Sequence, residues 1–252
     1  MKRAATIVSI GLVILGGCTS NSQLSTPQPE RAAEINLELG VEHLRKGNLK
    51  QAKEKIDRAL EQNPRFARGH LIAGMLYAQL SDERKAESHF ERAISLDPTN
   101  PEFKNNYAAY LCQHKKYERG EKQALAAAVD PLYKTPEVAY LNAGSCARGA
   151  GDAKRAEENF RKALAAKPRF GEALFQMAEL EYNQTEYMSA RAFLERYLEV
   201  GRTSPATLWL GVRIERGLGN QTQAQHYARR LKSEYPSAVQ TKELLESERN
   251  PG

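Results

Sequence analysis

The stretch from Gly74 to Pro98, GMLYAQLSDERKAESHFERAISLDP, decides the fold of this 252-residue chain. In this stretch an alanine follows a small residue after twelve positions. An apolar residue comes four positions later, a second small residue three positions after that, and a proline five positions further on. Six such stretches follow one another at intervals of about 34 residues. A fixed period of this length is typical of helix pairs that stack into a solenoid. The clearest copies are Gly74, Ala86, Phe90, Ala93 and Pro98; Gly40, Ala52, Ile56, Ala59 and Pro64; and Gly144, Ala156, Phe160, Ala163 and Pro168.

This pattern resembles the tetratricopeptide repeat, a helix–turn–helix unit that binds peptides or proteins once several units are stacked. The resemblance implies an all-α fold, a right-handed superhelical solenoid of about six repeats with a polar C-terminal capping helix. No stretch alternates apolar and polar residues over the length of a useful strand, which agrees with this fold class. We expect repeats near 33–66, 67–100, 101–136, 137–170, 171–203 and 204–237, and the cap at 238–252.

The N-terminus has the pattern of an export signal. Lys2 and Arg3 precede a short apolar run from Ile7 to Leu15, which is too short to cross a bilayer as a helix. Leu15-Gly16-Gly17-Cys18 resembles a bacterial lipobox, so residues 1–17 are predicted to be a signal peptide and Cys18 the lipidated residue. The alternative is an ordinary signal peptide that happens to be followed by a cysteine.

The segment after Cys18 predicts a lipid-anchored protein on a tether. Residues 18–30 are rich in Ser, Thr, Asn, Gln and Pro without periodicity, as flexible tethers are. By resemblance to bacterial lipoproteins, Thr19 favours the periplasmic face of the outer membrane, because an Asp there typically retains such proteins at the inner membrane. Without Lys2 and Arg3, 35 basic and 31 acidic residues remain, a net charge of about +4 without a basic block, so a nucleic-acid partner is not expected.

No pattern of catalytic or metal-binding residues emerges from the sequence. There is no nucleophile motif and no phosphate-binding glycine loop, so we expect neither an enzyme nor a cofactor or small-molecule substrate. None of the histidines has a second His or a Cys at metal-ligand spacing, so no metal site is predicted. They are His43, His70, His89, His114 and His226.

Two cysteines lie on the first helices of the third and fourth repeats. Cys112 and Cys146 are 34 residues apart, one solenoid step, and the periplasm is oxidising. A disulfide between them is predicted, and two buried reduced thiols that pack as small apolar side chains are the alternative.

The repeat loses its register between these cysteines. Ala108 and Gly144 are 36 residues apart, and the connection between Pro131 and Pro136 is longer than its counterparts. The extra residues represent either neutral loop drift or a local bend or contact site.

The inner surface of the solenoid is the predicted binding groove. Asn106 and Asn142 hold the same repeat position, so a ladder of amides for a peptide backbone is expected, unless these amides bond to neighbouring helix backbones. Leu71, Met75, Phe175 and Tyr182 would flank the groove with apolar pockets. Its predicted lining is Asn105, Asn106, Ala109, Gln113, Leu141, Asn142, Ser145 and Arg148.

Two segments narrow the family further. Asn105-Asn106-Tyr107-Ala108-Ala109-Tyr110-Leu111-Cys112, followed by Leu141-Asn142-Ala143-Gly144-Ser145-Cys146, resembles the type IV pilus biogenesis lipoproteins called PilF or PilW, although Ala108 and Ala109 replace an expected Gly. The resemblance implies a pilotin, which binds subunits of the pilus secretin and promotes their outer-membrane localisation and multimerisation for pilus biogenesis and twitching motility. The alternative is a repeat lipoprotein that scaffolds cell-wall hydrolases or other envelope assembly complexes.

Overall fold

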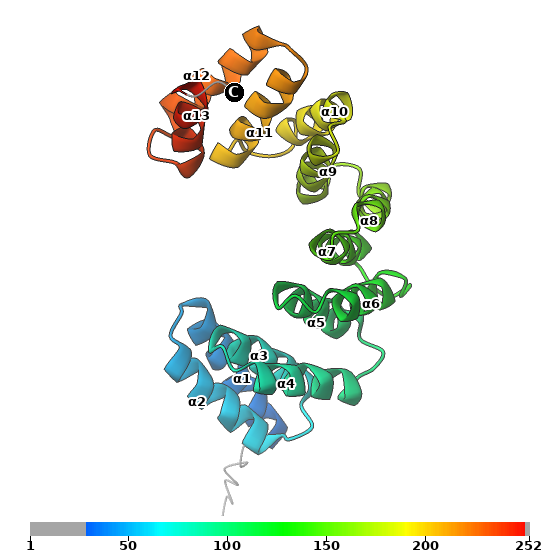
Figure 1. Cartoon of the computed structure of the whole chain (residues 1–252). Coiled ribbons are helices and arrows are strands. Elements are labelled where there is room, and N and C mark those ends of the chain that lie inside the picture. Colours follow the sequence, from blue (N-terminus) through cyan, green and yellow to red (C-terminus); the bar gives the residue numbers. More distant parts are fainter. Residues whose placement is uncertain (1–28, 250–252) are drawn as a thin grey trace, which may run out of the picture.

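The structure, a computed structural model, describes residues 29–249, which form thirteen α-helices and no β-strand (Figure 1). The all-α prediction is confirmed. The predicted signal peptide, Cys18 and nearly all of the predicted tether lie outside the described residues. The helices are α1 (Pro29–Arg45), α2 (Leu49–Gln62), α3 (Ala67–Gln79), α4 (Glu83–Leu96), α5 (Pro101–Gln113), α6 (Tyr117–Ala128), α7 (Pro136–Gly149), α8 (Ala153–Ala166), α9 (Gly171–Asn183), α10 (Tyr187–Leu198), α11 (Pro205–Gly217), α12 (Gln221–Glu234) and α13 (Val239–Arg249).

Twelve of these helices form six pairs, from α1 and α2 to α11 and α12, and every pair turns in the same way. The turn of each pair contains one residue with a left-handed backbone, a conformation that residues other than glycine seldom adopt. Its recurrence at one place in every pair confirms the six repeats expected from the sequence. The residues are Gly47, Ser81, Lys115, Gly151, Thr185 and Gly219, with φ between 58 and 83°.

Within a pair, a small residue on the first helix lets a bulky side chain of the second helix come close. A Cβ added to Gly144 would lie 2.5 Å from the Phe160 ring, and one added to Gly40 would lie 2.6 Å from Ile56. The spacing in the sequence therefore records a direct contact between the helices of each pair.

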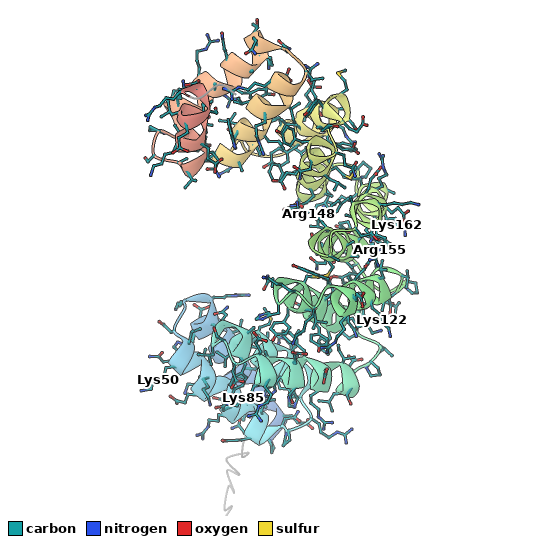
Figure 2. The ribbon with its side chains drawn as sticks, in the orientation of Figure 1. Lys50, Lys85, Lys122, Arg148, Arg155 and Lys162 are labelled. Atoms are coloured by element: carbon teal, nitrogen blue, oxygen red, sulfur yellow. A yellow bond between two sulfur atoms is a disulfide. The ribbon has the colours of Figure 1, made fainter. Side chains whose placement is uncertain are left out.

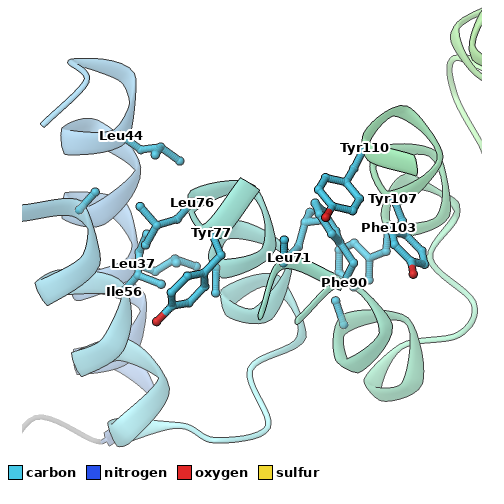
Figure 3. Packing of buried hydrophobic residues seen from close by; sticks show 14 of the residues in the cluster. Leu37, Leu44, Ile56, Leu71, Leu76, Tyr77, Phe90, Phe103, Tyr107 and Tyr110 are labelled. Atoms are coloured by element: carbon cyan, nitrogen blue, oxygen red, sulfur yellow. The ribbon is translucent and has the colours of Figure 1, made fainter. Parts of the chain in front are cut away.

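The apolar core consists of two large blocks, a junction of small side chains between them and a smaller cluster at the C-terminal end. The N-terminal block extends from Ala33 to Leu111 and includes Phe90, which packs among Leu71, Tyr107 and Tyr110 (Figure 3). The next block extends from Ala147 to Ile214, and the C-terminal cluster joins α11, α12 and α13 through Leu208, Leu231 and Leu244. Between the two blocks, α5, α6 and α7 meet through small clusters of buried alanines, which are Ala108, Ala124, Ala127, Ala128, Ala139 and Ala143. We call this region the alanine junction.

Buried carboxylates connect successive repeats. Glu121 on α6 accepts hydrogen bonds from Arg155 at 3.0 Å and from Asn159 at 3.3 Å, both on α8. Glu215 on α11 pairs with Arg191 on α10 through both guanidinium nitrogens that face it. These pairs fix neighbouring repeats at defined relative positions.

The stacked pairs form an open arc, with α5, α7, α9 and α11 on its inner side and α6, α8 and α10 on its outer side (Figure 1). Helix α1 begins at Pro29, so residues 29 and 30, the last two of the predicted tether, lie in its first turn. Proline is tolerated in the first helical turn, where its missing N–H has no helical partner, and Glu30 favours the same turn. At the other end, α13 buries Leu244 and packs on α11 and α12.

Candidate protein-binding surface

The residues predicted to line the groove lie on α5 and α7, the two inner helices at the centre of the arc (Figure 1). Their side chains differ in how much of their surface is exposed to solvent. Gln113 and Arg148 are exposed, Asn105 is buried, and Asn106, Ala109, Leu141, Asn142 and Ser145 are half-buried.

The amides of Asn106 and Asn142 do not bond to each other. Asn142 donates its amide N–H to Oδ1 of Asn105 at 2.8 Å, across 37 residues, whereas Asn106 donates to the carbonyl of Glu102 in its own helix at 2.8 Å. The disulfide partners on the same two helices are separated by 34 residues instead. No single separation in sequence describes all contacts between α5 and α7, because packed helices cross at an angle. Each amide therefore uses one donor inside the protein.

The structure joins Cys112 on α5 to Cys146 on α7 by a disulfide, with their Cα atoms 5.1 Å apart. Gly120 on α6 lies directly against it. A Cβ at Gly120 would lie 2.7 Å from Sγ of Cys146 and 2.8 Å from Sγ of Cys112. The repeat pattern has an alanine at this position elsewhere, so the sulfurs occupy the space of the missing methyl group.

Gly120→Ala should therefore lower the free energy of unfolding of the oxidised protein by about 1–3 kcal/mol, because the added methyl group overpacks the disulfide. The measurement is urea unfolding followed by circular dichroism. In a background that carries Cys112→Ala and Cys146→Ala, the same change should cost much less. An equal cost in both backgrounds would show that the backbone carbonyl of Ala108, 3.1 Å from the added atom, causes the loss instead.

The extra residues of the register slip form a packing contact. The connection from Val129 to Thr135 folds the ring of Tyr133 against Ala127, Ala128 and Ala139 of the alanine junction. Burial raises the pKa of the Tyr133 hydroxyl. Leu132 stays 78% exposed beside it.

The inner surface continues beyond α7 with contacts between successive first helices. Arg148 on α7 pairs with Glu179 on α9 at 3.1 Å. Of the four residues predicted to form apolar pockets, Leu71 is buried, whereas Phe175 and Tyr182 are half-buried and Met75 is exposed.

The N-terminal end of the solenoid exposes apolar side chains that the sequence analysis missed. Ile35 and Leu39 on α1 are 54% and 45% exposed. Their equivalents in the third repeat, Phe103 and Tyr107, are buried because a preceding repeat covers them. The repeat pattern could have indicated this exposure, since no earlier repeat covers the first helix of the first repeat.

Two histidines treated as isolated in the sequence lie together. Nδ1 of His70 on α3 is 3.0 Å from Nδ1 of His89 on α4, and Nε2 of His70 bonds to the carbonyl of Pro64. Burial is the main cause that lowers the pKa of both imidazoles. Within residues 29–249 no three His, Cys, Asp or Glu side chains gather as a metal site. No helix in this range is long and apolar enough to cross a bilayer.

Comparison with known families matches tetratricopeptide-repeat models to residues 37–101 and 147–208, together about half of the chain. The two ranges leave out residues 102–146, which contain the register slip and both disulfide cysteines.

Relatives resemble the chain over most of its length. The type IV pilus assembly protein PilF of Pseudomonas aeruginosa is 28% identical over 245 residues, which cover 96% of this chain and 97% of the relative. The crystal structure of PilW, a widely conserved type IV pilus biogenesis factor, has a TM-score of 0.78 at 28% identity and covers 84% of this chain and 98% of its own. The structure of Pseudomonas aeruginosa PilF has a TM-score of 0.75 at 26% identity, and the match covers 87% of this chain and 99% of that one.

Proposed function

We propose that this chain, which belongs to the tetratricopeptide-repeat proteins and is homologous to the type IV pilus biogenesis proteins PilF and PilW, is an outer-membrane lipoprotein pilotin. In this role it binds secretin subunits through its solenoid and promotes their localisation and multimerisation at the outer membrane. The observation that carries the proposal is the match to PilF over 96% of the chain.

The mechanism requires no chemistry at a reactive side chain. Lipid on Cys18 holds the protein at the membrane by burying acyl chains, and several chains make such an anchor durable. The residues after Cys18 give the solenoid reach, and its inner surface holds a secretin subunit. Tethering raises the effective concentration of captured subunits next to the membrane, so multimers form there without catalysis.

Cys18→Ala should leave the solenoid folded and move secretin multimers away from the outer membrane, because the protein loses its lipid. The measurement is the secretin multimer content of separated inner and outer membranes. Thr19→Asp is the matched control, since it keeps Cys18 and is expected to hold the lipidated protein at the inner membrane. Multimers that reach the outer membrane unchanged in the Cys18→Ala strain would refute the escort role.

A pull-down from envelope extracts separates this role from a cell-wall scaffold. With the solenoid as bait, a pilotin captures the large secretin, and the alternative captures cell-wall hydrolases instead.

A further inference from the structure

Helix α11 carries an aromatic–arginine stack on a half-buried stripe of its surface. Trp209, Arg213 and Arg216 follow one another at intervals of four and three, which places them on one side of the helix. The guanidinium of Arg213 lies 4.7 Å from the ring centroid of Tyr182 on α9 and 5.7 Å from that of Trp209. Arg216 lies 6.0 Å from Trp209 and donates to Ser247 of α13 at 2.9 Å. We call Tyr182, Trp209, Arg213 and Arg216 the arginine stack.

The stack faces the inside of the arc. Its contacts outside α11 come from α9, which lines the inner side, and from α13 at the end of the arc (Figure 1). Helices α10 and α12 also pack on α11. Figure 2 shows side chains of the inner helices that border the open space of the arc, among them the labelled Arg148 of α7.

The charges of the stack are not neutralised within the described residues. Among the ion pairs formed by residues 29–249, none includes Arg213 or Arg216. Nε of Arg213 is buried and has no hydrogen-bond partner. By contrast, Arg148 on α7 and Arg191 on α10 each pair with a glutamate. A guanidinium that aromatic rings hold in a fixed orientation is pre-organised to bind a carboxylate through two parallel hydrogen bonds.

A pocket of about 450 Å³ lies at the N-terminal ends of α9 and α11, lined in part by Phe175, Tyr197 and Val200. Gln176 of α9 also lines it, and Oε1 of this residue is buried without a hydrogen-bond partner. Gln176 precedes Tyr182 by six residues, so about 9 Å along α9 separate the pocket from the stack. An extended peptide covers this distance with about three residues.

The residues around the pocket add positive charge. Arg169 and Arg202 line it and form no ion pair within residues 29–249, and they outnumber Glu172, the acidic residue of the lining.

We propose that the arginine stack and this pocket bind an extended acidic segment of a protein partner. Carboxylates of the segment bond to Arg213 and Arg216, and an apolar side chain of the segment enters the pocket. Charge complementarity argues for this occupant, and Trp, Tyr and Arg are the residues that most often dominate binding energy at protein interfaces. The inference rests on the proposed function, because it identifies where on the inner surface the secretin subunit is held.

The site contains its own reporter, since Trp209 is the only tryptophan of the chain. The experiment titrates the protein with a short peptide that alternates Glu with Leu and follows the emission of Trp209. A second peptide with Gln in place of each Glu serves as the uncharged probe. We expect the acidic peptide to quench the Trp209 emission or shift its spectrum in a saturable way. The dissociation constant of the Gln peptide should be at least about tenfold higher.

Arg213→Gln should weaken binding of the acidic peptide by about tenfold or more, because it removes a charged donor that no other side chain replaces. Arg196→Gln is the matched control. Arg196 also stacks on an aromatic ring, that of Phe193 at 5.4 Å, but it belongs to the outer helix α10. Thermal unfolding followed by circular dichroism verifies that both variants fold, and Arg216→Gln provides an independent second test of the stack.

Equal affinity for the two peptides, or an equal loss in Arg196→Gln and Arg213→Gln, would overturn the proposal. Secretin capture by the same variants separates it from the proposed function. If Arg213→Gln captures secretin like the unchanged protein while Cys18→Ala still displaces the multimers, the site is refuted and the pilotin role stands. If the unchanged protein binds the acidic peptide through Arg213 but captures no secretin, the site stands and the pilotin role is refuted.

Discussion

Arg191→Met should lower the free energy of unfolding of the C-terminal repeats by about 3–5 kcal/mol, because it leaves a buried carboxylate without its partner. Glu215 is only 3% exposed, and Arg191 reaches it from the preceding repeat with an Nε–Oε1 distance of 2.8 Å. A charge that has left water and lost its counter-charge costs far more than the pair contributes when intact.

The measurement is urea unfolding followed by the fluorescence of Trp209, which lies on α11 together with Glu215. The double variant Arg191→Met with Glu215→Met should recover most of the loss, since apolar side chains of similar volume often replace a buried ion pair without cost. Arg230→Met is the control, because its i,i+4 pair with Glu234 is partly exposed and should contribute less than about 1 kcal/mol. Equal losses for Arg191→Met and Arg230→Met would contradict the account.

Replacing both Cys112 and Cys146 by alanine should cost about 3–4 kcal/mol of stability. The bridge closes a loop of 34 residues, and a loop of this size restricts the unfolded chain by about that amount. The effect should be felt at the centre of the arc, where the bridge joins α5 to α7 beside the alanine junction.

The measurement is the urea midpoint by circular dichroism, with and without a thiol reductant. The reductant should lower the midpoint of the unchanged protein toward that of the double variant and leave the variant itself unaffected. A midpoint of the unchanged protein that does not move on full reduction would exclude a stabilising role for the bridge.

The architecture was predictable because the contacts that define it are local. Gly74 and Phe90, or Gly144 and Phe160, belong to one helix pair, and their spacing in the sequence follows directly from the turn between the helices. The same reasoning predicted that the cysteines lie one solenoid step apart.

Contacts between residues of different repeats were harder to predict from the sequence. The partner of Asn142 is Asn105 and not Asn106, since the crossing of α5 and α7 sets the register and the sequence does not record this angle. Gly120 holds the position where the other repeats have alanine, and its missing side chain makes room for two sulfurs from other helices, a contact that the repeat pattern does not record. Arg213 escaped notice because its ring contact, Tyr182, lies in the preceding repeat and because no ion pair formed by residues 29–249 includes it.

The alanine junction sets how the two blocks of the arc sit relative to each other. Its methyl side chains let α6 pack on α7 more extensively than the second helix of any other repeat packs on the next first helix. The disulfide, the hydrogen bond from Asn142 to Asn105 and the pair between Glu121 and Arg155 join the same region. A larger side chain at one of these alanines would push α6 away from α7, so the width of the mouth of the arc depends on how small these residues are.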